Sequence, residues 1–325
     1  MKAGPQGDGT AYTPAGWRVT PAGAQKPAGF FPANAVLSPD GAAVLIPNII
    51  KDGNSKQTLQ VMDAKDGRVM QVVELDKNAG QGTAAGLAFS HDGSNVYLTT
   101  ANMDTVVVFG WDGAAHKLAI QKTLALPKGS YPQGVAVSSD DKTIYVTGQY
   151  ARTLIAVDIA SGKSKQAAAG AYPFGVVLSA DGRTAYVSNQ GENTLSVFSV
   201  DGLTIAPKSK ITVGTHPNNM LIDAKQQRMF VANGDSDTVS IVDTVSNTVK
   251  ALFHWLLLPV RMPDLSLPTS PSRLISARSM SLTAVITTLR LLIYPVKVAA
   301  KANTMKSSAV SRDLSPQAGI QPGCR

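Results

Sequence analysis

The chain has 325 residues, of which 44% are hydrophobic and 16% charged, amounts that suit a globular protein with one large core or two domains. Its net charge of +8 is localised, because residues 251–325 hold nine of the 30 basic and two of the 22 acidic side chains, which leaves 21 basic and 20 acidic in residues 1–250. A nucleic-acid-binding surface needs a basic stripe on the folded part, so this balance argues against a nucleic-acid partner.

Residues 1–29 form a lead-in that we expect to add a strand segment ahead of the main fold. Met1-Lys2 runs directly into Ala-Gly-Pro-Gln-Gly-Asp without an apolar stretch, so no signal peptide is visible.

Residues 30–250 contain a repeat. Five units align, and their recognisable segments are 35–69, 86–113, 134–163, 175–202 and 220–249. Corresponding positions in the second to fifth units, Gly86, Gly134, Gly175 and Asn219, are 48, 41 and 44 residues apart. Self-similarity at a regular period of this kind decides the fold, because each unit then folds as one module.

Each unit contains the same four predicted strands. An alternating run such as Val135/Val137 predicts a half-buried strand. Ser-x-Asp-Gly, as at Asp181-Gly182, predicts a tight hairpin. A strand rich in aromatic and β-branched residues follows, then a polar turn, a third strand such as 194–197, and a weaker fourth strand. Four antiparallel strands per unit predict an all-β β-propeller of four-stranded blades, with five legible blades in an incomplete or open ring. A β-sandwich is the alternative, but its strands would not repeat in this way.

The second and third strands carry a family resemblance. The segments IYVTG (144–148), AYVSN (185–189) and MFVAN (229–233) are each followed by a strand such as NTLSVF (193–198) or DTVSIV (237–242). They resemble the YVTN-repeat, or YncE-like, β-propeller family. The lead-in at 4–25 is similar to the start of bacterial secreted proteins that join such a propeller to an alkaline-phosphatase-family phosphoesterase. That resemblance implies an extracytoplasmic location.

Candidate binding residues lie where the first strands begin. In a propeller the first strands line the central channel, and here they are preceded by Tyr131-Pro132, Tyr172-Pro173 and His216-Pro217. We propose Tyr131, Tyr172, His216 and Asn218 as a channel rim that binds a small molecule or a protein. The alternative is that each X-Pro pair merely holds the chain extended.

The positions of the aspartates indicate structural roles and not catalytic or metal-binding ones. Asp104, Asp235 and Asp237 occupy polar turns, where calcium binding is conceivable but capping of the local backbone is the simpler interpretation. A second series recurs at equivalent strand ends and therefore indicates a structural device of the blade: Asp63, Asp112, Asp158 and Asp243.

No other pattern points to a cofactor, a metal or a catalytic group. The four histidines, His91, His116, His216 and His254, lack the spacing of metal ligands, and the single cysteine, Cys324, excludes a disulfide framework. The Ser-x-Asp-Gly serines lack the Gly-x-Ser-x-Gly turn of a nucleophile.

Residues 251–325 form an aperiodic tail that we expect to be poorly ordered. Its longest apolar stretch, near Leu256 to Val260, is far shorter than the roughly 20 residues of a membrane helix, so we expect no transmembrane segment. When codons are read one base out of phase, Ser279 through Pro295 can give YVANGGNNDVAVIDIS, Ala251 through Leu256 can give TISLA, and Arg312 through Cys324 can give GFIPAGWYPTGLP. These strings resume the blade pattern, which suggests a frameshift near residue 251 that scrambles a sixth blade.

Two function classes remain open. The first is a non-enzymatic binding or scaffold propeller, part of a larger protein whose phosphoesterase activity would reside in another domain. The second is a lactonase-like propeller hydrolase, which needs acidic, His or Arg side chains converging on the channel. The first-strand starts carry Gly86, Gly134, Gly175 and Asn219 instead.

Overall fold

The computed structural model describes residues 4–5, 10–12, 18–19, 26–29, 31–49 and 57–254. Three two-residue strands, β1 (Gly4–Pro5), β2 (Ala11–Tyr12) and β3 (Arg18–Val19), form a small antiparallel sheet. The predicted tail and the out-of-phase blade lie outside the described residues, apart from the first four residues of the tail.

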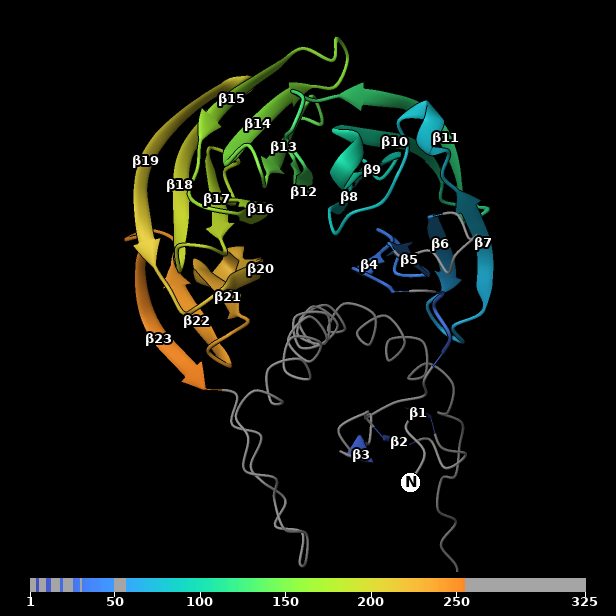
Figure 1. The fold of residues 1–325 in the computed structure, drawn as a ribbon, viewed down its shortest axis with the longest axis horizontal. Coiled ribbons are helices and arrows are strands. Elements are labelled where there is room, and N and C mark those ends of the chain that lie inside the picture. The colour runs from blue at the N-terminus through green and yellow to red at the C-terminus, as the bar shows by residue number, and fades with distance from the viewer. Residues whose placement is uncertain are drawn as a thin grey trace, which may run out of the picture. The chain divides into compact units, whose positions relative to one another are not determined.

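Five four-stranded antiparallel sheets, numbered here as blades one to five, make up residues 36–254 (Figure 1). Blade one contains β4 (Val36–Leu37), β5 (Ala43–Asn48), β6 (Thr58–Asp63) and β7 (Val69–Glu74). Blade two contains β8 (Leu87–Phe89), β9 (Asn95–Thr99), β10 (Thr105–Asp112) and β11 (Lys117–Ala125). Blade three contains β12 (Pro132–Val137), β13 (Thr143–Gly148), β14 (Thr153–Asp158) and β15 (Ser164–Ala168). Blade four contains β16 (Pro173–Leu178), β17 (Thr184–Asn189), β18 (Thr194–Asp201) and β19 (Thr204–Thr212). Blade five contains β20 (Pro217–Asp223), β21 (Arg228–Asn233), β22 (Thr238–Asp243) and β23 (Thr248–His254).

The five-blade prediction is confirmed, with two differences. The fourth strands are not uniformly weak, because β11 and β19 have nine residues each. The fifth blade ends at His254, beyond the predicted boundary at 250.

Three short 3-10 turns, Lys77–Ala79, Ala101–Met103 and Ala224–Gln226, join strands. The described residues include no helix long and apolar enough to cross a membrane.

The Ser-x-Asp hairpins are closed by side chains. In blade four, Ser179 Oγ donates to Asp181 Oδ1 at 2.5 Å and accepts from the Thr184 amide at 2.9 Å, while Asp181 also accepts from the Arg183 amide at 3.0 Å. Gly182 completes the turn at φ 70°, in the left-handed region that glycine tolerates. The serine and the aspartate thus satisfy turn amides that would otherwise lack partners.

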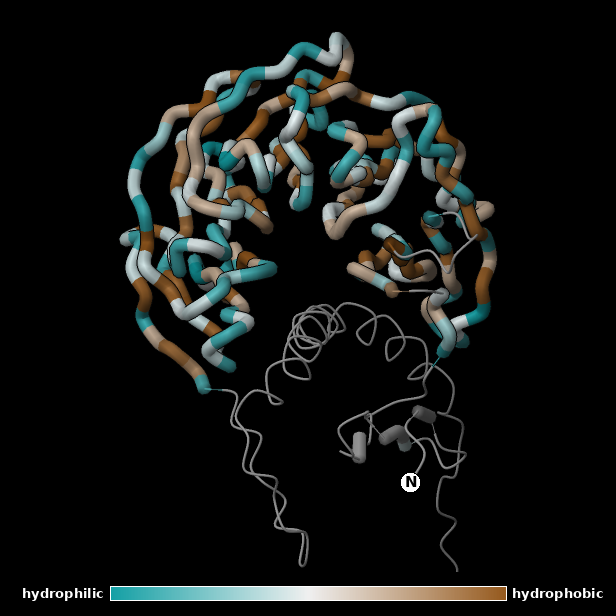
Figure 2. Tube along the Cα trace, viewed as in Figure 1, coloured by the Kyte–Doolittle hydropathy of each residue, from teal (hydrophilic) through white to brown (hydrophobic). Residues whose placement is uncertain are grey.

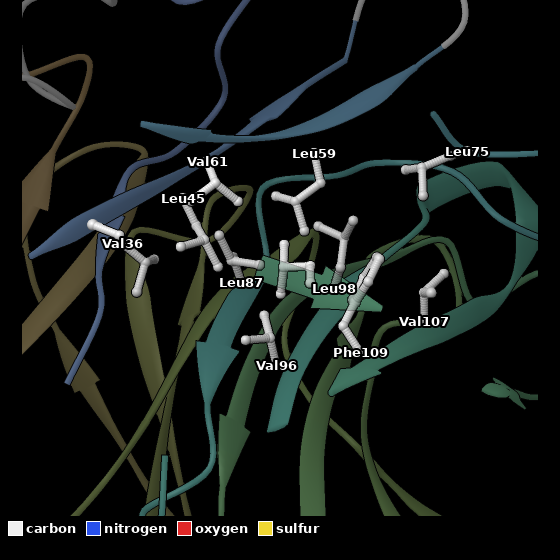
Figure 3. Close-up of a cluster of buried hydrophobic side chains, with 12 residues drawn as sticks. Val36, Leu45, Leu59, Val61, Leu75, Leu87, Val96, Leu98, Val107 and Phe109 are labelled. Carbon is white, nitrogen blue, oxygen red and sulfur yellow. The ribbon is translucent and has the colours of Figure 1, made fainter. Parts of the chain in front are cut away.

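Apolar residues recur along the middle strands of each blade (Figure 2). Because successive side chains point to opposite faces of the sheet, they form a hydrophobic core between each pair of neighbouring blades. In β10, Val107 and Phe109 face blade one, whereas Val106 and Val108 face blade three. Figure 3 shows the first seam, where Leu45 and Leu59 of blade one meet Leu98 of blade two. A fully buried side chain of this size stabilises the fold by about 1.5–3 kcal/mol.

A buried hydroxyl also links each pair of blades from the second to the fifth. Thr147 Oγ1, at the end of β13, accepts from the Gly134 amide at 2.8 Å and donates to the Phe174 carbonyl of the next blade at 2.7 Å. Thr99 and Ser188 occupy the same position and donate to Gln133 O at 2.6 Å and to Asn218 O at 2.7 Å.

Blade one makes the corresponding link differently. Pro47 stands at the hydroxyl position and Asn34 at the glycine position, and Asn34 Nδ2 donates to the Ala85 carbonyl of blade two at 2.8 Å. An amide side chain therefore replaces a hydroxyl where proline removes it.

Candidate functional site

The residue before proline has an unusual backbone ahead of four first strands. Phe31, Tyr131, Tyr172 and His216 have φ between 50° and 55°. Non-glycine residues are uncommon in this left-handed region, which costs about 1–2 kcal/mol per residue. Strained residues persist only where the surroundings hold them, and they are frequent at binding sites.

Hydrogen bonds hold these residues in place. Each carbonyl accepts from the backbone amide that follows the second strand: Phe31 from Ile49, Tyr131 from Gln149, Tyr172 from Gln190, and His216 from Gly234, at 2.9–3.2 Å. Asp104 Oδ1 accepts from the Tyr131 amide at 2.8 Å, and Asn193 Oδ1 accepts from the His216 amide at 3.2 Å. The side chains at these positions are therefore presented from a rigid backbone.

Three tyrosines form one aromatic cluster across blades three and four. The rings of Tyr131 and Tyr150 stack with centroids 4.2 Å apart and an interplanar angle of 14°. Tyr172 meets Tyr150 edge-on at 6.5 Å and 85°. Tyr150 is 61% exposed and Tyr172 49%. Burial, with a further contribution from Tyr150, raises the pKa of Tyr131, so this phenol stays protonated at neutral pH.

A chain of amide side chains spans blades three, four and five beside the tyrosines. Gln149 Nε2 donates to Gln190 Oε1 at 3.5 Å, and Gln190 Nε2 donates to Asn218 Oδ1. Gln149 and Gln190 follow second strands directly, and Asn218 belongs to the first strand of blade five. The rim therefore offers donors and acceptors without formal charge.

Blade five adds an ionisable pair. His216 Nδ1 lies 3.6 Å from Asp235 Oδ2, with side-chain exposures of 43% and 58%. This pair is the nearest approach to acid–base chemistry among the described rim residues.

The structure separates the four predicted site residues into three groups. Tyr131 and Tyr172 lie in one cluster through Tyr150, Asn218 bonds to Gln190, and His216 pairs with Asp235. The sequence prediction missed Tyr150, Gln149 and Gln190. Comparing the residue after each second strand would have drawn attention to the two glutamines, whereas Tyr150 joins the cluster only through the fold.

The four strand-end aspartates act in their own turns, as expected. Asp63, Asp112, Asp158 and Asp243 accept hydrogen bonds from amides two or three residues onward. Asp104 differs from the expected local cap, because its carboxylate accepts from the amides of Gly129 and Tyr131 and so holds the loop before Tyr131. Within the described ranges, no group of three or more His, Cys, Asp or Glu side chains could hold a metal ion.

The five four-stranded antiparallel sheets of residues 36–254 define the class of protein, a β-propeller. A sequence model of the YNCE-like beta-propeller family matches residues 8–211, and the chain belongs to that family. No functionally curated protein matches the sequence significantly.

Solved structures share the fold. A functionally unknown protein from Desulfotomaculum acetoxidans aligns with TM-score 0.57 and 16% identity, over 68% of this chain and 71% of that one. The Pseudomonas aeruginosa periplasmic gluconolactonase aligns with TM-score 0.55 and 23% identity, over 69% of each chain. A Bacteroides fragilis protein, provisionally described as a 6-phosphogluconolactonase, aligns with TM-score 0.55 and 17% identity, over 75% of this chain and 90% of that one. At these identities the similarity establishes the fold alone.

Proposed function

We propose that this chain is a non-enzymatic binding module, in which the tyrosine cluster and the amide chain of blades three to five hold an uncharged ligand. The supporting observation is that Tyr131 is fixed at both its amide and its carbonyl, so the cluster is organised before any ligand arrives. Preorganisation lowers the entropy cost of binding.

We also propose that the module acts outside the cytoplasm as part of a larger protein with a phosphoesterase domain. The similarity of the lead-in to such secreted proteins supports this proposal. The frameshift hypothesis belongs with it and rests on the out-of-phase strings in residues 251–325, which resume the blade pattern. Resequencing the gene through codon 251 tests the hypothesis, and an unshifted sequence there would reject it.

A ligand screen by thermal shift tests the binding role, using the full chain and a panel of saccharides, sugar lactones, nucleotides and short peptides. We expect at least one compound to raise the melting temperature of the wild type. Tyr150→Ala and Gln190→Ala should abolish that shift. Phe31→Ala is the matched control, because Phe31 is also aromatic, 51% exposed and before proline, but belongs to blade one. A shift that survives both rim variants would contradict the proposed site.

Lactone hydrolysis is the second candidate, favoured by the His216–Asp235 pair. His216 would accept a proton from water as that water attacks the lactone carbonyl. The ring C–O bond would then break as the ring oxygen takes this proton back from His216 and leaves as the hydroxyl of the open hydroxy acid. Hydrolysis of glucono-δ-lactone above the spontaneous rate, lost in His216→Gln, would support this activity over the non-enzymatic role.

A further inference from the structure

The Tyr150 ring, with Tyr131 stacked behind it, forms the floor of the aromatic cluster. One face of Tyr150 is covered by Tyr131 at 4.2 Å, yet the residue remains 61% exposed, so much of the ring that Tyr131 does not cover is open to solvent. A ring supported from behind is a rigid surface on which a flat apolar face can stack.

The cluster also has a wall. The Tyr172 ring stands at 85° to Tyr150. It packs against the backbone of Gly191 so closely that an added Cβ there would lie only 2.9 Å from Tyr172 Cδ2. Floor and wall form an aromatic corner, defined here by Tyr150 and Tyr172. A backbone hydrogen bond from Gln190 to the Tyr172 carbonyl fixes the wall further.

Uncharged polar groups lie beside this corner. Gln149 precedes Tyr150 in the chain and is half-buried, and its amide continues to Gln190 and Asn218. An amide offers both donors and acceptors, which is what a hydroxyl group requires of a partner.

We propose that the aromatic corner with the Gln149 amide is a subsite for a neutral pyranose ring, so that the ligand of the rim is a saccharide. This inference rests on the proposed binding function. A pyranose has an apolar C–H face that matches the floor and equatorial hydroxyls that match the amides. A proline-rich peptide is less suited, because such peptides dock along successive aromatic grooves, whereas here amides continue the rim beyond the corner.

Saturation-transfer NMR on the full chain tests the proposal, with methyl β-glucoside, cellotriose, maltotriose and chitotriose as probes at millimolar concentration. We expect transfer to ring protons of at least one trisaccharide. Tyr150→Ala should weaken that saccharide's binding about tenfold, as expected for loss of one stacking contact. Tyr150→Phe should retain binding within about threefold, since it keeps the floor, and Phe31→Ala should leave binding unchanged.

Other outcomes separate this inference from the binding role itself. No transfer to any saccharide, together with binding of a decaproline peptide that Tyr150→Ala removes, would overturn the saccharide assignment and leave the binding module intact. Saccharide binding that is unaffected by Tyr150→Ala would overturn the corner as its site. No binding by any compound in either assay would overturn both.

Discussion

The hydroxyl of Thr147 takes part in two partly buried hydrogen bonds, one within its blade and one to the next. The Thr147 side chain is fully buried, so replacement by valine keeps the shape but leaves the Gly134 amide and the Phe174 carbonyl without that partner. An unsatisfied buried group costs about 1–3 kcal/mol.

Thr147→Val should therefore lower the free energy of unfolding by about 2–3 kcal/mol in urea titrations. Thr147→Ser is the matched control, because Ser188 makes the same two bonds in blade four, and it should cost less than about 1 kcal/mol. Equal unfolding midpoints for the valine variant and the wild type would show that the link between blades does not contribute to stability.

The hairpin aspartates make stability depend on pH. Hydrogen bonds from Ser179 and the Arg183 amide hold the pKa of Asp181 below its ordinary 3.8, and Asp140 is held in the same way by Ser138 and Lys142. A carboxyl whose folded pKa is lowered stabilises the fold above the unfolded value, and this contribution is lost as the pH falls through the folded value.

We expect the melting temperature to fall as the pH drops below about 4 and through the lowered folded pKa values. Asp181→Asn should be less stable than the wild type at pH 7, with the difference narrowing as the pH falls through the folded pKa of Asp181, where the wild-type carboxyl becomes protonated. If the stability difference between the wild type and Asp181→Asn does not change with pH, the destabilisation comes from the changed shape of the side chain and not from the loss of its charge.

At the scale of the strand, the bulge near the start of the first strand contains a glycine in blades three and four. The register of β12 against β13 shifts between Pro132 and Val135, and Gly134 lies within that shift. A Cβ at Gly134 would collide with the Phe174 carbonyl of the next blade and lie 3.1 Å from Gly175 Cα.

Gly134→Ala should therefore cost about 3 kcal/mol or prevent folding, because backbone atoms of two blades cannot move apart cheaply. Gly113→Ala is the control: its Cβ would lie an ordinary 3.6 Å from Trp111 Nε1, and it should change the unfolding free energy by less than about 0.5 kcal/mol. Circular dichroism melts of the two variants give the comparison, and similar melts would contradict the collision.

At the scale of the whole molecule, the face of blade five that points away from blade four is apolar. Phe230 and Ile241 occupy the positions of Tyr186 and Val197, which are buried at the seam between blades four and five. In β23, Phe253 is 58% and Leu252 47% exposed. Exposed apolar strands of this kind promote association between chains.

Leu252→Lys combined with Phe253→Thr should raise the monodisperse fraction in size-exclusion chromatography without lowering the melting temperature. Lys210 already stands at the position of Leu252 in blade four, which shows that the strand accommodates it. The exposed pair Val69 and Val72 in β7, changed to threonine, is the control for apolar exposure elsewhere. An unchanged elution profile for the β23 variant would reject this strand as the source of association.

The amino-acid sequence by itself determined the blades, because hairpin chemistry and strand alternation are local and recur in each unit. Ser179, Asp181 and Gly182 act within one turn, so their role follows from spacing alone. The rim was predicted in part, since Tyr131 and Tyr172 share a position before proline.

Only the tertiary structure decided which side chains meet. Tyr150 stacks on Tyr131 and faces Tyr172, and Gln190 reaches Asn218, because neighbouring blades pack at a particular distance and angle. Asn34 replaces the linking hydroxyl for the same reason, since its partner carbonyl is 51 residues away. Contacts between repeats depend on how the sheets pack, and no local pattern in the sequence records that packing.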